Sequence, residues 1–201
     1  PLDIHEVGEE DGRLGKVLKM LEAVSLPAHL LERYPHQLSG GQQQRVVIAR
    51  ALINGPKLVV CDESVSALDV SVQAQVVNLL VDLQKQLGLT YLFITHDLSV
   101  VRHISSRIAV MYLGRIVELA DSEALLENPL HPYTRALISA VPVPDPRARA
   151  SRATISGEPP NPFSPPSGCA FHARCPHADD QCRSQLPEFR PIGENHMVAC
   201  H

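Results

Sequence analysis

The chain has 201 residues, 44% hydrophobic and 20% charged, which is the composition of an ordinary globular protein long enough to bury a core. Its formal net charge of -4 provides no basic field of the kind that nucleic-acid-binding proteins use, so nucleic acid is not an expected partner. The sequence contains no apolar run of about 18 to 20 residues and no secretory signal, so we expect a cytosolic protein that can sit on a membrane partner.

Helices are expected in the first quarter of the chain. Apolar residues at helical spacing predict an amphipathic helix over 14–33 that is broken near Pro27 and followed by a short helical piece to Tyr34. Ser39 is an expected N-cap, followed by a glycine-opened helix that runs to about Asn54.

The start of this second helix suits a phosphate group. Backbone N–H groups at a helix start point along the positive end of the helix dipole, and Gly40 and Gly41 permit close approach. Ser39 adds a hydroxyl group and Gln42 an amide. Taken alone, a serine-glycine-glycine turn favours an ordinary capped surface helix over a phosphate site.

The next segment predicts a parallel crossover unit. "KLVVCDE" (57–63) and "LTYLFITHD" (89–97) are apolar runs of buried-strand length, each closed by polar residues. Between them, apolar residues repeat at helical spacing over 70–87, and Gly88 is the expected C-cap. Ligands of such strand–helix–strand units bind beyond the carboxyl ends of the strands.

The polar residues at these strand ends suit phosphate chemistry. Asp62 can hold a magnesium ion, commonly through water, while Glu63 polarises an attacking water. His96 can donate a hydrogen bond to a terminal phosphate or orient that water. Each signal by itself also fits a structural residue, whereas their shared order and spacing favour a site.

The remainder of the sequence contains a hairpin pattern followed by a proline-rich region. "RIAVMYLGRIVELA" (107–120) predicts a β-hairpin with its turn at the glycine. Prolines become frequent after Asn128, which predicts a linker over 141–165 and a small cysteine-bearing tail after it.

Cysteines divide into one core residue and one group. Cys61 lies in an apolar strand and is expected in the core. The other four are separated by 5, 6 and 17 residues, which is not the paired C-x-x-C spacing of common zinc sites. Four thiolates can hold a [4Fe–4S] cluster, and unligated thiols remain the alternative. The residues concerned are Cys169, Cys175, Cys182 and Cys200, with His172, His177, His196 and His201 as further candidate ligands.

Four motifs in order resemble those of the ATP-binding cassette (ABC) ATPases. "LSGGQ" (38–42) is similar to their signature motif, "LVVCDE" (58–63) to the Walker B strand with the catalytic glutamate, "SALD" (66–69) to the D-loop, and "ITHD" (94–97) to the histidine switch. The resemblance implies an α/β fold, here the C-terminal part of a P-loop NTPase domain with parallel strands and crossover helices. It also implies ATP and Mg²⁺ as ligands, with Asp69 of the D-loop beside the nucleotide.

The resemblance narrows to the ATPase subunits of dipeptide and oligopeptide importers, through "RYPHQLSGGQQQR", "NPLHPYTRALISAVP" and "PPSGCAFHARCP". It implies two kinds of direct partner: a second ATPase subunit arranged head to tail, and two membrane permeases. It also implies an external peptide-binding protein as an indirect partner, and a location on the cytoplasmic face of the inner membrane. Similar tails in this subfamily are associated with a [4Fe–4S] cluster. The implied division is 1–35, the end of the helical subdomain; 36–128, the C-terminal half of the ATPase; and 129–201, the proline-rich extension.

Two departures from the family pattern qualify this expectation. Ser64 replaces the usual proline, which loosens the turn without removing a reactive group. No G-x-x-x-x-G-K-[ST] phosphate loop occurs in these 201 residues. We therefore expect the C-terminal portion of an ATPase subunit, which can offer residues 39–42 to ATP held by another subunit but hydrolyses little alone. A non-transport ABC ATPase and a non-catalytic remnant are the alternatives.

Overall fold

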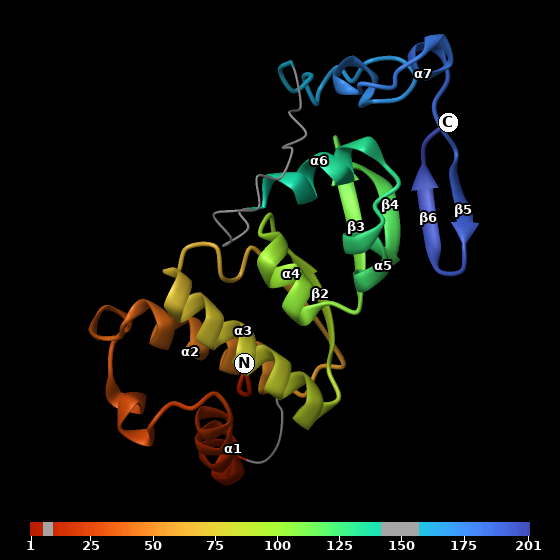
Figure 1. Ribbon diagram of the computed structural model, residues 1–201. Coiled ribbons are helices and arrows are strands. Elements are labelled where there is room, and N and C mark those ends of the chain that lie inside the picture. Colours follow the sequence, from red (N-terminus) through yellow and green to blue (C-terminus); the bar gives the residue numbers. More distant parts are fainter. Residues whose placement is uncertain (6–9, 142–156) are drawn as a thin grey trace, which may run out of the picture. The chain divides into compact units, whose positions relative to one another are not determined.

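The computed structural model describes residues 1–5, 10–141 and 157–201 of an α/β protein (Figure 1). The chain divides into two units, residues 1–100 and 101–201, which are treated separately below. Most of the linker predicted over 141–165 lies outside the described residues. Within the described ranges, no helix has the length and apolar character needed to cross a bilayer.

The first unit begins with two helical segments, as predicted. Helix α1 (Glu10–Ala23) ends before Ser25, whose φ of 56° is left-handed, and a short 3-10 helix η1 (Ala28–Glu32) follows Pro27. Proline cannot continue an α-helix, since it lacks the backbone N–H and its ring clashes with the preceding turn. The break near Pro27 is thus confirmed, although α1 ends earlier than predicted.

A second 3-10 turn, η2 (Pro35–Gln37), leads into α2 (Gly40–Leu52), which begins at the predicted N-cap Ser39. Helix α2 packs against α1 and α3. The Arg45 guanidinium donates to the Val24 carbonyl oxygen at 3.0 Å and so ties α2 to the end of α1.

The predicted crossover unit is present. Strands β1 (Leu58–Asp62) and β2 (Thr90–Ile94) pair in parallel, with Leu58 opposite Thr90 and Asp62 opposite Ile94. Between them lies α3 (Val70–Leu87), which ends at Gly88 with the left-handed φ of 64° expected of a C-cap glycine. The parallel register places the carboxyl ends of both strands at the same edge of the sheet.

The two strands differ from the prediction that they are buried on both faces. On the face towards α3, Cys61 is buried as predicted, and the Tyr91 hydroxyl donates to the Leu80 carbonyl oxygen at 3.0 Å. On the opposite face, four apolar side chains remain 44–57% exposed: Leu58, Val60, Leu92 and Ile94. Among the described residues that face is only partly covered, and an apolar run alone cannot tell one covered face from two.

The second unit contains the predicted hairpin of β3 (Arg107–Tyr112) and β4 (Arg115–Asp121), and α4 (Leu98–Ile104) spans the division at residue 100. Leu113 and Gly114, with φ of 46° and 76°, form the turn, as a two-residue hairpin loop of the primed type requires. Helices α5 (Ser122–Glu127) and α6 (Pro132–Ala140) follow.

The cysteine-bearing segment completes the sheet of this unit. It contains η3 (His172–Arg174), α7 (Asp180–Ser184), β5 (Phe189–Gly193) and β6 (His196–Ala199). The four-stranded sheet has the order β3-β4-β6-β5 with every neighbouring pair antiparallel.

The core of the second unit is built jointly by the hairpin and the cysteine-bearing segment. Phe171 is 2% exposed, and its ring lies 5.2 Å from Tyr112 and 5.5 Å from Tyr133, centroid to centroid. Aromatic pairs at such distances add to the stabilisation that comes from their buried area. The other members of the core are Ile108, Val110, Val117, Ala120 and Leu125.

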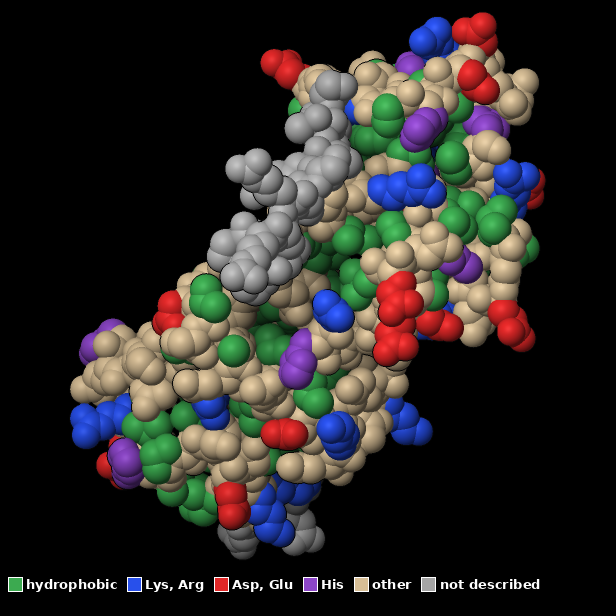
Figure 2. Space-filling model, in the orientation of Figure 1, with side chains coloured by type: hydrophobic (Ala, Val, Ile, Leu, Met, Phe, Trp, Pro, Cys, Tyr) green, Lys and Arg blue, Asp and Glu red, His purple; other side chains and the backbone are tan. Residues whose placement is uncertain are grey.

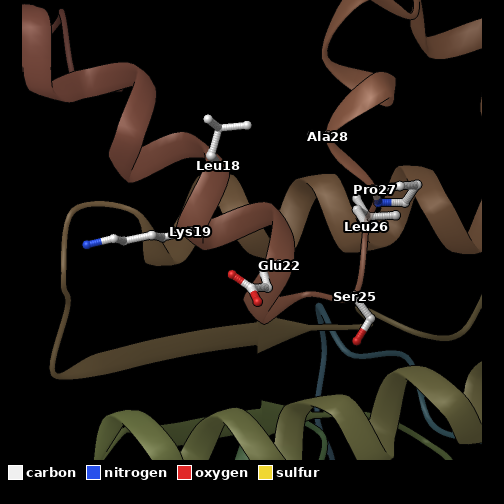
Figure 3. A pocket seen from close by; sticks show the side chains of 7 residues that line it. All are labelled: Leu18, Lys19, Glu22, Ser25, Leu26, Pro27 and Ala28. Atoms are coloured by element: carbon white, nitrogen blue, oxygen red, sulfur yellow. The ribbon is translucent and has the colours of Figure 1, made fainter.

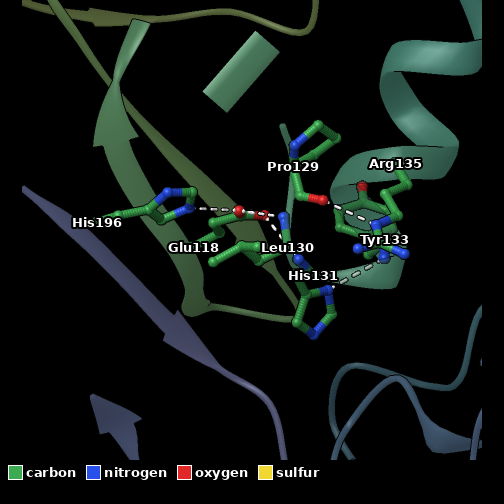
Figure 4. A network of polar contacts seen from close by, with 7 residues as sticks. All are labelled: Glu118, Pro129, Leu130, His131, Tyr133, Arg135 and His196. Carbon is green, nitrogen blue, oxygen red and sulfur yellow. Dashed lines mark hydrogen bonds and ion pairs between the residues drawn. The ribbon is translucent and has the colours of Figure 1, made fainter. Parts of the chain in front are cut away.

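A buried carboxylate connects three parts of this unit (Figure 4). Glu118 on β4 is 0% exposed and accepts hydrogen bonds from the Leu130 N–H at 2.7 Å and the His131 N–H at 3.0 Å. Its third partner is His196 Nε2 on β6, at 2.7 Å. A buried charge is costly unless it is paired and hydrogen-bonded, so these contacts hold the start of α6 and strand β6 against β4.

On the face that Figure 2 shows, acidic and basic side chains are interspersed, and apolar side chains are visible between them.

Candidate functional site

The signature turn, residues 38–42, forms a capping box at the start of α2. Ser39 Oγ accepts a hydrogen bond from the Gln42 N–H at 3.3 Å, and Gln42 Oε1 accepts from the Ser39 N–H at 3.0 Å. Gln43 Nε2 also stabilises the turn, because it donates to the carbonyl oxygens of Pro35 and Leu38 at 2.8 and 3.1 Å. The first helical N–H groups, at Gly40 and Gly41, have no carbonyl group one turn earlier within the helix to pair with.

The two glycines of this turn differ in their surroundings. A Cβ atom on Gly41 would lie 2.7 Å from Val72 Cγ1 at the start of α3, whereas one on Gly40 would lie 3.8 Å from Leu68 Cδ2. The sequence suggests that both glycines serve close approach of a ligand. The structure adds that Gly41 is also required for packing inside the unit.

The strand ends bring Glu63 and His96 together. Glu63 Oε1 lies 3.0 Å from His96 Nδ1, with side-chain exposures of 45% and 78% respectively. The Glu63 N–H donates to the carbonyl oxygen of Ile94 at 3.0 Å, which continues the pairing of β1 with β2 by one residue. The parallel register therefore delivers these two predicted site residues to one place.

The contact between Glu63 and His96 also shifts the pKa values of both side chains. The hydrogen bond from His96 holds the pKa of Glu63 below its usual value, and the same bond raises the pKa of His96. The pH range in which both side chains are ionised is therefore wider than it would be without their contact.

Asp62 and Asp69 occupy different environments. The exposed Asp62 carboxylate makes no hydrogen bond or ion pair with the described part of the chain, and it lines an open hollow of about 470 Å³ with Glu63 and with Gln44 of α2. Asp69 is the N-cap of α3, where its Oδ1 accepts from the Val72 N–H at 2.9 Å and the Ser71 hydroxyl at 2.7 Å. The Ser71 hydroxyl contributes most to lowering the pKa of Asp69.

Sequence reasoning did not identify Asp97, which follows His96, or Gln73, which contacts Asp97 from α3. Asp97 Oδ1 accepts from the Ser99 N–H at 2.8 Å, and its Oδ2 accepts from Gln73 Nε2 of α3 at 3.1 Å. The signal for Asp97 was available, because an aspartate two residues before a helix N–H is a common capping pattern. The link to Gln73 joins residues 24 positions apart, so no local pattern predicts it.

A second open hollow, of about 480 Å³, lies where α1 ends (Figure 3). Lys19 and Glu22 extend from α1, and Leu26 and Pro27 come from the segment that follows. The hollow thus combines an apolar base with one side chain of each charge sign.

The predicted cysteine ligands lie in one neighbourhood. The Cys169 N–H donates to the Cys182 carbonyl oxygen at 2.8 Å, and Cys169 and Cys175 both pack against the core of the unit. Burial raises the pKa of Cys200, and the charges of the other three thiols raise it further. Even so, no three His, Cys, Asp or Glu side chains in the described ranges are arranged around one metal-ion position.

Most of the histidines near this group have other partners. His172 Nδ1 lies 2.8 Å from the Cys169 carbonyl oxygen, and His201 Nε2 lies 3.0 Å from that of Gln185. His196 contacts Glu118, as described above. These three side chains are therefore engaged elsewhere than at a shared metal position.

Two family models match the chain. The family described as "ABC transporter" matches residues 2–66, and the one described as "Oligopeptide/dipeptide transporter, C-terminal region" matches residues 117–182. The first range contains the signature turn and the Asp62–Glu63 pair, and the second contains Glu118, α6 and three of the four clustered cysteines.

The sequences of several relatives align with nearly all of this chain. The oligopeptide transport ATP-binding protein AppF of Bacillus subtilis is 52% identical over 203 residues, covering 100% of this chain and 62% of AppF. A Brucella ovis protein, also named for peptide import and ATP binding, is 55% identical over 199 residues, covering 99% of this chain and 63% of its own length. The chain therefore spans less than two thirds of the length of these relatives.

Solved structures agree with these matches. The ATP-binding cassette MJ1267 in its ADP conformation is 31% identical with a TM-score of 0.55, covering 61% of this chain and 49% of MJ1267. The protein cbiO1 from Clostridium perfringens is 30% identical with a TM-score of 0.57, covering 63% of this chain and 50% of cbiO1. The chain therefore matches the ABC transporter family over residues 2–66 and the C-terminal region of the oligopeptide and dipeptide transporters over residues 117–182, and its relatives named above are peptide-import ATP-binding proteins.

Proposed function

We propose that this protein is the ATP-binding and ATP-hydrolysing subunit of an ABC importer for dipeptides or oligopeptides. The observation that carries the proposal is the contact of Glu63 with His96, 3.0 Å apart at the carboxyl ends of two adjacent parallel strands. Ligands of open α/β sheets bind at this edge, and a carboxylate beside a histidine suits the activation of water next to a phosphate.

In this proposal each polar residue at the strand ends has one task. Glu63 polarises the attacking water, and His96 donates a hydrogen bond to the terminal phosphate. Asp62 is exposed and free of protein partners among the described residues, as a carboxylate that holds Mg²⁺ through water requires. When bound, that ion would neutralise phosphate charge.

The signature turn would contact ATP held by a second, head-to-tail subunit. The N–H groups of Gly40 and Gly41 and the Ser39 hydroxyl group are the donors, and the Gln42 side-chain amide adds one more. Asp69, through its place at the D-loop, would lie beside the same nucleotide. The capping box supports this task, since it holds the donors in position before the ligand arrives.

We further propose two membrane permeases as partners, with an external peptide-binding protein acting through them, and a location on the cytoplasmic face of the inner membrane. The proposed division of labour is contact with the permeases by 1–35, ATP chemistry by 36–128, and an importer-specific extension over 129–201. The hollow at the end of α1 supports the first assignment, because it lies within that segment and combines apolar and charged groups.

Two measurements test the ATPase proposal. The polypeptide of residues 1–201, which contains no phosphate loop, should hydrolyse negligible ATP alone. In the permease complex, Glu63→Gln should lower ATP turnover by roughly 10²-fold or more, the usual contribution of a positioned acid–base group. A Glu63→Gln complex with undiminished turnover would contradict the assignment.

Affinity purification from detergent-solubilised membranes distinguishes the alternatives. Recovery of two permeases supports the importer, whereas recovery of DNA or ribosomes supports a non-transport ABC ATPase. A protein recovered with none of these, and without ATP binding, is a non-catalytic remnant.

For the cysteines we propose a [4Fe–4S] cluster held by Cys169, Cys175, Cys182 and Cys200. The shared neighbourhood of the four thiols supports it, and four cysteine thiolates are the usual ligands of such a cluster. Anaerobic purification with iron and sulfide analysis tests it, and a colourless, metal-free and stably folded protein would refute it.

A further inference from the structure

The first turn of α3 contacts two other motif-bearing segments. Its N-cap is Asp69, whose Oδ1 accepts hydrogen bonds from the Val72 N–H at 2.9 Å and the Ser71 hydroxyl at 2.7 Å. Val72 then faces the signature turn, and Gln73 reaches the segment that carries His96. Adjacent residues of one capped turn thus contact two parts of the proposed nucleotide machinery.

The contact with the signature turn leaves no free space. Since a Cβ atom on Gly41 would lie 2.7 Å from Val72 Cγ1, the backbone of α2 already touches the Val72 side chain. Val72 is β-branched, and only one side-chain rotamer is strongly preferred in a helix. A displacement of the start of α2 towards α3 therefore pushes on the first turn of α3.

The contact with the His96 segment is a hydrogen-bonded anchor. Gln73 Nε2 donates to Asp97 Oδ2 at 3.1 Å, and the second oxygen of Asp97 caps α4 through the Ser99 N–H at 2.8 Å. The Asp97 N–H donates to Thr95 Oγ1 at 3.1 Å. Both neighbours of His96 are thereby held, and the link to α3 runs through Gln73.

We propose that the first turn of α3 couples the signature turn to His96, with Val72 and Gln73 as the positioning residues. The inference rests on the proposed function, in which the signature turn contacts ATP of a second subunit while His96 and Glu63 serve the chain's own site. A nucleotide arriving at the signature turn then changes the orientation of His96 relative to Glu63 in the same chain. Two sites are coupled when one element has different positions that both sites bias.

A double-mutant cycle on the 201-residue chain tests this coupling without nucleotide. Gly41→Ala, which pushes on Val72, should shift the His96 ring resonances in two-dimensional NMR spectra. In a Gln73→Ala background the same change should have at most about half that effect, because residues that share contacts are non-additive. Gln73→Arg keeps a side-chain donor for Asp97 and should restore the full response.

Gly40→Ala is the matched control, since its Cβ atom would meet only an ordinary contact at 3.8 Å and should leave His96 unchanged. If Gly41→Ala does not fold, Val72→Ala replaces it, because removing the contact should also shift His96 in a Gln73-dependent way. Equal shifts with and without Gln73, or no shift, overturn the coupling. Either result leaves the ATPase proposal untouched, since that proposal is judged by turnover in the permease complex.

Discussion

Glu63 occupies a backbone conformation that residues with side chains rarely adopt. Its φ of 47° is left-handed, and three hydrogen bonds hold it there: its N–H to the Ile94 carbonyl oxygen, and the Ser66 N–H and hydroxyl to its own carbonyl oxygen. Such conformations persist only where the surroundings enforce them, and they are frequent at functional sites. Here the turn directs the carboxylate towards His96.

The Glu63–His96 pair predicts a specific titration. The pKa of Glu63 is lowered and that of His96 is raised, so the ion pair exists from below the ordinary glutamate range to above the ordinary histidine range. The pair is lost as pH rises through the His96 pKa, or as it falls through the Glu63 pKa. Glu63→Gln should therefore lower the His96 pKa in an NMR titration, while the His131 pKa stays the same. An unchanged His96 midpoint would show that the contact is absent in solution.

His131 is the opposite case, since burial lowers its pKa to about 4 despite the nearby Glu118 carboxylate. Its Nδ1 accepts the Tyr133 N–H at 3.1 Å as the N-cap of α6, which requires a neutral ring. The unfolded chain binds this proton near pH 6.5 and the folded chain only near pH 4, so stability falls as pH drops between these values, by about 3 kcal/mol.

His131→Asn retains a capping oxygen but cannot titrate. Denaturant unfolding at pH 7 and at pH 4.5 should therefore show a smaller acid-induced loss of stability for this variant. A pH dependence identical to that of the unchanged chain would contradict the assignment.

At the scale of elements, the close contact of α2 with α3 makes the two signature glycines unequal. Gly41→Ala should destabilise the first unit by about 1 to 3 kcal/mol, because the new methyl group overlaps the stiff Val72 side chain. Gly40→Ala meets only ordinary contact and should be neutral or stabilising by up to about 1 kcal/mol. Thermal unfolding of both variants checks this, and equal melting temperatures would refute it.

Some elements were predictable because their signals are local. The Ser39 cap, the Gly88 cap and the Leu113–Gly114 turn each depend on residues within one turn of chain. Helix α6 was not predicted, although His131 followed by Pro132 at the first helical position is a usable start signal. Prolines are frequent after Asn128, and that composition by itself does not predict a helix.

At the scale of the molecule, Glu118 joins β4, the start of α6 and strand β6. Glu118→Ala leaves two backbone N–H groups and His196 without their buried partner, and should cost about 3 to 5 kcal/mol. Strand β6 should lose protection first, because only Glu118 and Leu119 of β4 pair with it. Hydrogen exchange of the β6 amides measures this, and the milder Glu118→Gln is the matched control. Unchanged β6 protection in Glu118→Ala would show that the carboxylate does not hold the strand.

The sequence by itself determined the family motifs, the crossover unit β1–α3–β2, the hairpin of β3 with β4 and the caps at Ser39 and Gly88. These features depend on residue type, periodicity and short spacing. Only the tertiary structure decided that the cysteine-bearing segment completes a sheet with β4, that Phe171 enters the core of the second unit, and that Gln73 holds Asp97 beside His96. The physical reason is that a strand partner, a core contact or a buried hydrogen bond is selected by chain segments brought together in space, and neither member of the pair carries a local signal for the other.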